Sequence, residues 1–180
     1  MAADVRSKIL LAAGRVVARD GAKHLTLEAV AIEAKLSKGG LLYHFATKQA
    51  LVAALVEDLV SRFEKIRAGH AATGGPGAHT SAYLWATFDE AGRELDKASA
   101  GVAAAVANDP SLLEPLRVAY RRWQHQLTSD GIDPVSATIV RLAVDGLWFS
   151  QILGIDPLPK RLLTGVIDRL GSLVVAERAR

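Results

Sequence analysis

Apolar residues recur every three or four positions along most of the chain, which is the spacing of one face of an α-helix. The pattern predicts helices over residues 4–19, 26–35, 37–44, 47–69, 79–98, 101–107, 111–129, 133–153 and 159–178. The segment 70–78 holds three glycines and a proline, which predicts a loop and a junction between two parts. No segment has the pattern of a strand, so the sequence predicts an all-α protein.

The composition excludes several classes of protein. Half of the residues are apolar, which is enough for a core, and the chain has no cysteine. A disulfide framework, a cysteine zinc site and a thiol nucleophile are therefore excluded, and a reducing compartment is favoured. The polar N-terminus has no apolar signal core behind it, and no apolar run approaches the ~20 residues that a membrane span needs. We expect a soluble, cytoplasmic protein with no membrane partner.

Basic residues are concentrated at the N-terminal end. Residues 1–50 hold eight Lys and Arg against four Asp and Glu, whereas residues 51–180 hold fourteen against fifteen. The net charge is therefore +4 in the first segment and −1 in the second. A surface that faces DNA has such an excess, but a solvated basic face would give the same pattern.

The segment Leu36–Lys48 has the residue types that DNA recognition requires. Three short helices with a compact turn between the second and third form a helix-turn-helix, whose third helix enters the major groove. Gly39 and Gly40 in its first turn would let the backbone approach DNA closely, or would only loosen the turn. Tyr43 and His44 offer hydrogen-bond donors, with an interfacial tyrosine and a hydrogen-bonded histidine as the alternative.

Helix N-termini are expected to supply phosphate contacts. Hydroxyl groups at 26, 37 and 47 can cap the second, third and fourth helices, whose free N–H groups suit a phosphate. Lys48 adds a full charge there, while Leu41, Leu42 and Phe45 are expected to be mostly scaffold. The candidate DNA-binding residues are Thr26, Ser37, Lys38, Gly39, Gly40, Leu41, Tyr43, His44, Thr47 and Lys48.

Three stretches together resemble the N-terminal domain of TetR/AcrR-type transcriptional regulators. They are Thr26-Leu-Glu-Ala-Val-Ala, Leu36-Ser-Lys-Gly-Gly-Leu-Leu-Tyr-His-Phe and Thr47-Lys-Gln-Ala-Leu, and the resemblance covers residues 5–55. The family pattern has a Lys-Gly pair and an aromatic-His-Phe ending in the third helix, and a Lys at the start of the fourth. This chain departs from it at Gly40, where a polar residue is common, and at Leu42, where an aromatic residue is common. These departures imply more reliance on phosphate contacts and DNA shape.

The resemblance implies a helix-turn-helix DNA-binding domain over residues 1–50 and a helical bundle for ligand binding and dimerisation over residues 51–180, with the fourth helix, 47–69, linking the two. It also implies a homodimer, a near-palindromic operator in double-stranded DNA and a repressor that is released by a small-molecule effector. A helical-bundle ligand-binding protein or enzyme without DNA binding remains one alternative. A non-specific DNA-binding protein is the other.

The C-terminal half has no catalytic or metal-binding motif, so we expect no enzymatic activity, metal or cofactor. Asp145 and Arg141 are expected to be paired or solvated. Aromatic clustering gives candidate ligand-binding residues, with core packing as the alternative: Trp85, Phe88, Asp89, Trp123, His125, Trp148 and Gln151. Apolar and small positions on one side of the last two helices predict a dimer interface: Ile139, Leu142, Ala143, Gly146, Phe149, Leu153, Leu163, Val166, Ile167, Leu170 and Val174.

Overall fold

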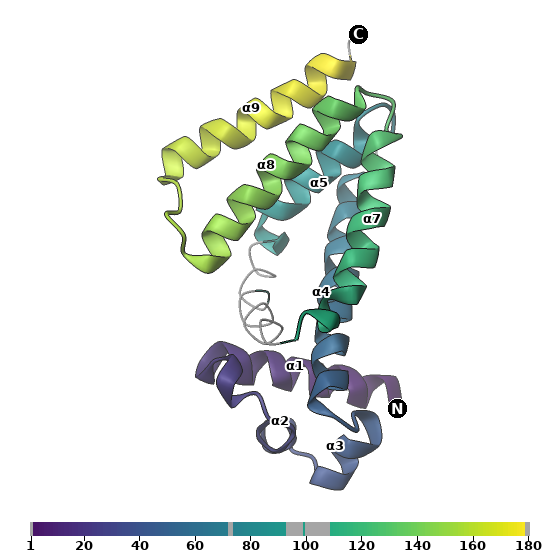
Figure 1. Cartoon of the computed structure of the whole chain (residues 1–180), viewed down its shortest axis with the longest axis vertical. Helices are drawn as coiled ribbons and strands as arrows, with labels where there is room; N and C mark the ends of the chain where they lie inside the picture. The colour runs from purple at the N-terminus through teal and green to yellow at the C-terminus, as the bar shows by residue number, and fades with distance from the viewer. Residues whose placement is uncertain (1, 72–73, 93–98, 100–108, 179–180) are drawn as a thin grey trace. The chain divides into compact units, whose positions relative to one another are not determined.

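The structure is a computed structural model that describes residues 2–71, 74–92, 99 and 109–178. Within these ranges the chain forms helices and turns, without a strand. In order, the elements are α1 (Ala2–Asp20), the 3₁₀ helix η1 (Ala22–His24), α2 (Leu27–Ala34), α3 (Lys38–His44), α4 (Lys48–His70), α5 (Ala78–Phe88), the 3₁₀ helix η2 (Pro110–Leu113), α7 (Glu114–Thr128), α8 (Pro134–Leu153) and α9 (Lys160–Arg178) (Figure 1). The all-α prediction is confirmed, and none of these helices is both long and apolar enough to cross a membrane.

One predicted helix is interrupted. The pattern predicted a continuous helix over 79–98, but α5 ends at Phe88 and Asp89 is extended. The Asp89 carboxylate accepts a hydrogen bond from the backbone N–H of Gly92 (2.7 Å), which starts a new helical turn. A Cβ at Gly92 would lie 2.2 Å from the carbonyl oxygen of Ala86, so this turn requires glycine. The helix predicted over 101–107 lies outside the described residues.

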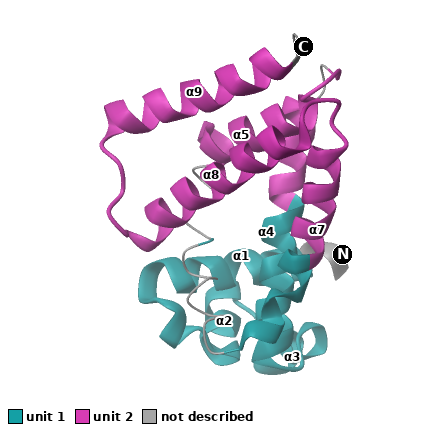
Figure 2. Cartoon of the chain, turned by 45° about the horizontal axis from the view of Figure 1, so that its top comes forward, with its two compact units in different colours: residues 1–61, 97–117 teal, residues 62–96, 118–180 magenta. Residues whose placement is uncertain are grey.

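The chain divides into two compact units, shown in different colours in Figure 2. One unit comprises residues 1–61 and 97–117, and the other comprises residues 62–96 and 118–180. Helix α4 contributes residues to both units. The assignment of DNA binding to residues 1–50 and of ligand binding and dimerisation to residues 51–180 remains a prediction.

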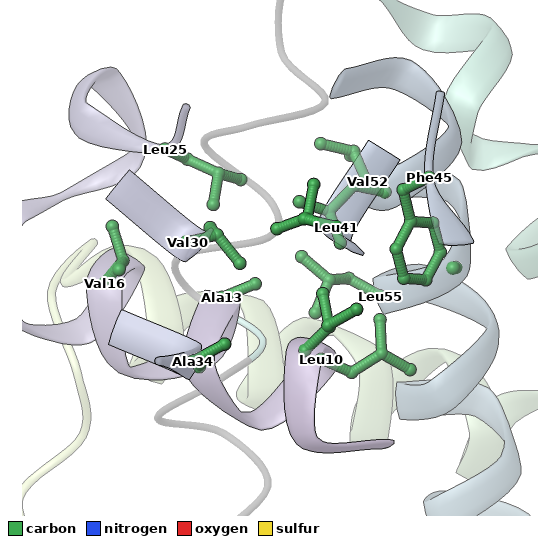
Figure 3. Close-up of a cluster of buried hydrophobic side chains, with 14 of the residues drawn as sticks. Leu10, Ala13, Val16, Leu25, Val30, Ala34, Leu41, Phe45, Val52 and Leu55 are labelled. Carbon is green, nitrogen blue, oxygen red and sulfur yellow. The ribbon is translucent and has the colours of Figure 1, made fainter. Parts of the chain in front are cut away.

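The first unit is built around one hydrophobic core (Figure 3). Helix α1 places Ile9 and Val16 in this core, α2 adds Val30, and α3 adds Leu41, all without solvent exposure. The N-terminal half of α4 closes it with Leu51, Val52, Ala54, Leu55 and Val56. This packing fixes α3 against α1, α2 and α4, so the orientation of α3 is set by buried apolar contacts.

The turn between α2 and α3 is a left-handed helix cap. Lys35 has φ 55° and ψ 46°, and its N–H donates to the carbonyl oxygens of Ala31 and Ile32. The N–H of Leu36 also donates to Ala31 (2.9 Å). This is the arrangement with which helices often end, and it reverses the chain within three residues. A compact turn of this kind is the one that the sequence predicted between the two helices.

The second unit packs α5, α7, α8 and α9 together. Its buried apolar residues include Leu84 of α5, Leu127 of α7 and Val144 of α8. Asp130, which follows α7, holds the start of α5 although it lies 50 residues away in sequence. Its carboxylate accepts hydrogen bonds from the backbone N–H groups of His79 and Thr80 and from the Thr80 hydroxyl. The free N–H groups of α5 are thereby satisfied by a buried anion, which the helix dipole favours.

Candidate functional site

Helix α3 has one buried face and one exposed face. Leu41 is fully buried and Phe45 is 3 % exposed, so positions four residues apart point into the core. Lys38, Gly39, Leu42 and Tyr43 are exposed. The exposed face therefore presents a cation, a backbone without a side chain, an apolar group and a phenol to the surroundings.

Two leucine assignments require correction. Leu41 was expected to be mostly scaffold and was also a candidate DNA-binding residue; it has no solvent exposure and belongs to the core, which corrects the second assignment. Leu42 was expected in the core, but its side chain is 38 % exposed and lies on the face of Tyr43, which is 85 % exposed. The run of apolar residues does not show which side of α3 faces the core. The packing of Leu41 and Phe45 in a core shared with α1 and α4 determines that side. An exposed Leu42 is suited to contact a thymine methyl group.

The two glycines of α3 have different surroundings. A Cβ at Gly40 would lie 3.2 Å from the Ser37 hydroxyl oxygen, and that oxygen accepts a hydrogen bond from the Gly40 N–H (3.0 Å). Gly40 therefore leaves room for the cap of its own helix. A Cβ at Gly39 would meet nothing within 4 Å. No contact among the described residues therefore requires glycine at position 39. A requirement for glycine there would come from a partner that approaches the backbone closely.

Three capped helix N-termini lie in this unit. Thr26 accepts from the N–H of Ala29 (3.0 Å), Ser37 caps α3, and Thr47 accepts from the N–H of Ala50 (3.1 Å). The predicted caps are confirmed. Thr26, Ser37, Thr47 and Lys48 are all exposed. The remaining N–H groups of these first turns and the Lys48 ammonium are available to a phosphate.

Charges at α1 and α2 are partly neutralised within the chain. Glu33 accepts from Arg15 Nε (2.8 Å) and Arg19 Nη1 (2.8 Å), and the Arg19 guanidinium holds the pKa of Glu33 below its ordinary value. Lys38 Nζ lies 4.0 Å from a carboxylate oxygen of Glu28, with both side chains well exposed. Arg15 and Arg19 therefore join α1 to α2, and their charges are partly compensated within the chain.

The remaining DNA candidate is His44, the last residue of α3. Its ring packs edge-on against the Tyr43 ring, with centroids 5.2 Å apart, and its side chain is half-buried. The Tyr43 hydroxyl is the more accessible donor of the pair. Nine of the ten candidates are thus exposed or half-buried, and Leu41 lies in the core, so a DNA-binding role for the nine stays a prediction.

The candidate ligand residues occupy varied environments. Trp123 is 3 % exposed, and Phe88 is 8 % exposed. The Trp85 ring lies against Gly171 of α9, while the Trp148 ring packs against Phe149. Three polar members complete the set: Asp89 binds His70 Nε2 (2.8 Å), His125 is exposed, and Gln151 is half-buried.

A polar and aromatic cluster in the second unit was not predicted. Asp145 of α8 accepts hydrogen bonds from the hydroxyls of Tyr83 (2.6 Å) and Tyr120 (3.2 Å) and from Arg141 Nη1 (2.8 Å). Burial raises the pKa of Asp145, although these donors oppose the shift. Arg141 Nε also donates to Gln124 (2.5 Å). The expectation that Asp145 and Arg141 are paired is confirmed.

One sequence signal could have revealed this cluster. Arg141 and Asp145 are the two charged residues of α8, which is otherwise uncharged and mostly apolar, and they lie four residues apart. Such a pair on a helix that packs in a core faces other polar groups. Their partners on α5 and α7 come from distant segments, so the sequence could not identify them.

The tyrosines of this cluster predict a pH dependence of stability. Burial raises the pKa of Tyr120 to about 12 and raises that of Tyr83 well above its ordinary value. A raised pKa in the folded state gives stability that is complete below the unfolded value of about 10 and lost as the pH rises toward the folded value. We expect urea unfolding to show a loss of about 1.4 kcal/mol per pH unit for each tyrosine above pH 10. Tyr120→Phe should make this loss less steep.

An absorbance titration checks the same prediction directly. In a Tyr43→Phe background the remaining two tyrosines are Tyr83 and Tyr120. Their tyrosinate absorbance should rise only well above pH 10 in the folded protein and near pH 10 in urea. Equal midpoints in the two states, or an unchanged stability slope in Tyr120→Phe, would contradict the assignment.

The candidate interface residues of α8 and α9 differ in solvent exposure. On α8, Ile139, Leu142, Phe149 and Leu153 are 44–56 % exposed, and Val135, which was not predicted, is 66 % exposed. Gly146 lies on the same stripe with open space at its Cβ position, and Ala143 beside it is half-buried. Positions 135, 139, 142, 146, 149 and 153 follow helical spacing, so they form one continuous exposed face. We call these six residues the α8 stripe.

On α9 the predicted face points inward. Leu170 and Val174 are 6 % and 2 % exposed and belong to the chain's own core, which corrects their assignment to an interface. Leu163, Val166 and Ile167 are half-buried. The exposed apolar residues of α9 are instead Leu162, Leu173 and Val175. Helix α9 packs against α5 and α8 with its more regular apolar stripe, so that stripe stabilises the monomer.

Comparisons with known proteins agree with this architecture. Residues 9–55 match the family model of bacterial regulatory proteins of the tetR family, and residues 77–174 match that of the tetracyclin repressor-like C-terminal domain. Together the two models cover the helix-turn-helix and most of the helices that follow α4. A comparison with curated proteins gave no match.

Solved structures have the same fold. A transcriptional regulator from Rhodococcus sp. Rha1 is 24 % identical, with a TM-score of 0.74 over 95 % of this chain and 96 % of that chain. A putative TetR-family transcriptional regulator from Rhodococcus sp. is 20 % identical, with a TM-score of 0.73 over 97 % and 99 %. The multidrug binding protein EbrR complexed with ethidium is 27 % identical, with a TM-score of 0.64 over 92 % and 98 %.

The fold and the matched domains define a helical transcriptional regulator with an N-terminal helix-turn-helix. The chain belongs to the TetR family of bacterial regulatory proteins. Regulators of this family are generally non-enzymatic transcription factors.

Proposed function

We propose that this protein is a homodimeric repressor that binds a near-palindromic operator and is released by a small-molecule effector. The observation that carries the proposal is the exposed face of α3, where Lys38, Gly39, Leu42 and Tyr43 stand clear of the core that fixes the helix. Lys38 and Tyr43 would donate to base edges or phosphates, and Leu42 would contact a base methyl group. Gly39 would allow the backbone to approach the groove.

The helix N-termini would position α3 in the groove. The first turns of α2 and α4, capped by Thr26 and Thr47, would each hold a phosphate, and Lys48 would add a charge. Such contacts fix register and orientation without reading sequence. Because most of the donors outside α3 are of this kind, we expect DNA shape to contribute to specificity.

The α8 stripe would form the dimer interface. Six positions of one helix face expose apolar or small side chains, and Gly146 at the middle of the stripe permits close approach of a second helix. Exposed apolar faces of this size mark interaction sites, and a two-fold axis would pair α8 with its copy, flanked by the exposed leucines of α9. The two α3 helices would then meet successive major grooves, about 34–36 Å or a multiple apart.

An effector would act on the second unit. EbrR, a 27 % identical relative, was crystallised with ethidium, which supports a ligand in the helical bundle of this protein. The effector must bind the DNA-free state more tightly than the DNA-bound state, since a ligand with equal affinities shifts nothing. Helix α4 has residues in both units and is the segment through which ligand binding would reach the DNA-binding unit.

Binding to the DNA upstream of the protein's own coding sequence tests the proposal. Fluorescence anisotropy at about 50 and about 200 mM salt, against a scrambled duplex, should show at least about 10³-fold preference for one site. Equal affinity for both duplexes, falling steeply with salt, would indicate a non-specific DNA-binding protein. Absence of binding to either duplex would indicate a helical bundle that does not act on DNA.

Lys48→Ala is expected to weaken binding to specific and scrambled DNA alike, by about tenfold, and to lower the salt slope by about 1. Lys38→Ala should also reduce discrimination between the two duplexes. Lys160→Ala removes an exposed lysine at the start of α9 and serves as the matched control, with no expected change. If Lys48→Ala binds as tightly as the unaltered protein, the phosphate role of Lys48 is wrong.

A further inference from the structure

Arg67 of α4 is a buried cation within an aromatic cluster of the second unit. The residue is 4 % exposed, and its guanidinium carbon lies 5.7 Å from the Tyr83 ring centroid and 5.6 Å from that of Trp123. Phe63 packs edge-on against both of these rings. The guanidinium is therefore enclosed mainly by π faces, which attract its charge but are weak acceptors of its N–H groups.

The donors of Arg67 are incompletely satisfied. Nη2 donates to Gln126 (3.1 Å), whereas Nε and Nη1 have no hydrogen-bond partner among the described residues. Buried side-chain donors are almost always bonded in native proteins, because an unmet donor retains its full desolvation cost. Nε and Nη1 therefore retain the capacity to donate to a further acceptor.

The charge around Arg67 is also unbalanced. Its nearest carboxylate is Glu64, at 3.7 Å from Nη1. The same Glu64 oxygen accepts from Arg122 Nη2 (2.6 Å) and from the Trp123 indole N–H. One carboxylate thus serves two guanidinium groups, and Asp130 adds only a weaker electrostatic attraction, so Arg67 has no carboxylate of its own at hydrogen-bond distance. Burial lowers the pKa of Arg67 even though Glu64 opposes this shift, as expected for an incompletely compensated cation.

The other carboxylates near this cluster are already occupied. Asp130 accepts from the start of α5, and Asp145 accepts from Arg141 and two tyrosine hydroxyls. A cationic ligand would therefore find no unengaged anion among these groups, and would be repelled by Arg67. An anionic ligand would supply an acceptor for the Arg67 N–H groups and compensate their buried charge at the same time.

We infer that the effector is an acid with an aromatic or apolar body, whose carboxylate accepts from Arg67 while its body packs among Phe63, Tyr83 and Trp123. This inference rests on the proposed function, since it names the chemical class of the effector. It also sets this protein apart from its relative EbrR, which was crystallised with ethidium, a cation.

Matched acids and amides test the inference on the full-length protein without DNA. The probes are 2-naphthoate with 2-naphthamide, phenylacetate with phenylacetamide and decanoate with decanamide, followed by tryptophan fluorescence and thermal unfolding. At least one acid should bind at least about tenfold more tightly than its amide, since the amide oxygen can still accept from the guanidinium but carries no charge to compensate it. Arg67→Gln should reduce that preference to within about twofold.

Arg161→Gln is the matched control, because it removes an exposed guanidinium of α9 outside the Glu64 group and should keep the preference for the acid. If Arg67→Gln does not fold, the comparison of acids with amides in the unaltered protein still tests whether the protein prefers an acid.

The inference is overturned if no acid binds, if the amides or ethidium bind as tightly as the acids, or if Arg67→Gln keeps the preference. A neutral or cationic compound that releases the operator would overturn it while leaving the repressor function intact. Absence of operator binding would instead contradict the proposed function alone.

Discussion

Gly39→Leu is expected to abolish operator binding while the protein stays folded. A Cβ at this position meets nothing within 4 Å, so the new side chain fits the free protein. Replacement of glycine in the first turn of a helix should leave stability unchanged or raise it by up to about 1 kcal/mol. In the complex, however, the leucine would occupy the space between α3 and the DNA. We expect operator affinity to fall by at least about 100-fold, which corresponds to about 2.7 kcal/mol.

Gly14→Leu provides the matched control. Gly14 lies in α1 and also has open space at its Cβ position, but it is not part of the α3 face. Anisotropy with operator DNA and thermal unfolding should be measured for both variants. If Gly39→Leu binds the operator as tightly as Gly14→Leu, the exposed face of α3 is not the surface that approaches DNA.

Leu142→Glu is expected to convert the dimer to a monomer. Leu142 is 56 % exposed and lies in the middle of the α8 stripe, next to Gly146. A two-fold axis through this stripe would bring the two copies of position 142 close together, so the variant would bury like charges without partners. Light scattering after size exclusion should show a monomer at micromolar concentration. Since a monomer contacts one half-site, operator affinity should fall by about 10²–10⁴-fold.

Val118→Glu distinguishes loss of the interface from a general effect of a new charge. Val118 of α7 is 47 % exposed and lies outside the α8 stripe, so this variant should remain dimeric and bind the operator normally. A dimeric Leu142→Glu protein with unchanged affinity would show that the α8 stripe is not the interface.

The sequence was informative where structure is local. Thr26, Ser37 and Thr47 stand at helix starts, and each accepts the expected backbone hydrogen bond, because a cap depends on residues only three positions apart. Asp89 shows the limit of this reasoning. Its carboxylate caps a new turn inside an apolar pattern that looks continuous, so periodicity alone could not place the break.

Helix orientation was harder to predict. Leu41 and Leu42 are adjacent and chemically identical, and the packing of α3 on α1 and α4 decides which of them is buried. Helix α9 has apolar residues around much of its circumference, and its contacts with α5 and α8 select the inward face. The sequence pattern gives the spacing of a face but not the partner that covers it.

The Arg67 cluster depends on contacts between distant segments. Glu64 and Arg67 lie on α4, whereas Trp123 and Gln126 lie on α7, almost sixty residues further along the chain. Trp123 was a ligand candidate because aromatic residues cluster along the sequence, and its cationic neighbour was not identified. A buried arginine cannot be distinguished from a surface arginine by sequence pattern when it follows an amphipathic stripe.

Hydroxyl-radical footprinting of the DNA upstream of the coding sequence is the most direct test of the central claim that a dimer of this protein reads an operator with α3. We predict two protected half-sites related by dyad symmetry, with centres about 10 base pairs or a multiple apart. The Gly39→Leu dimer should lose both. Uniform protection along the DNA, no protection, or an unchanged footprint with Gly39→Leu would contradict the claim.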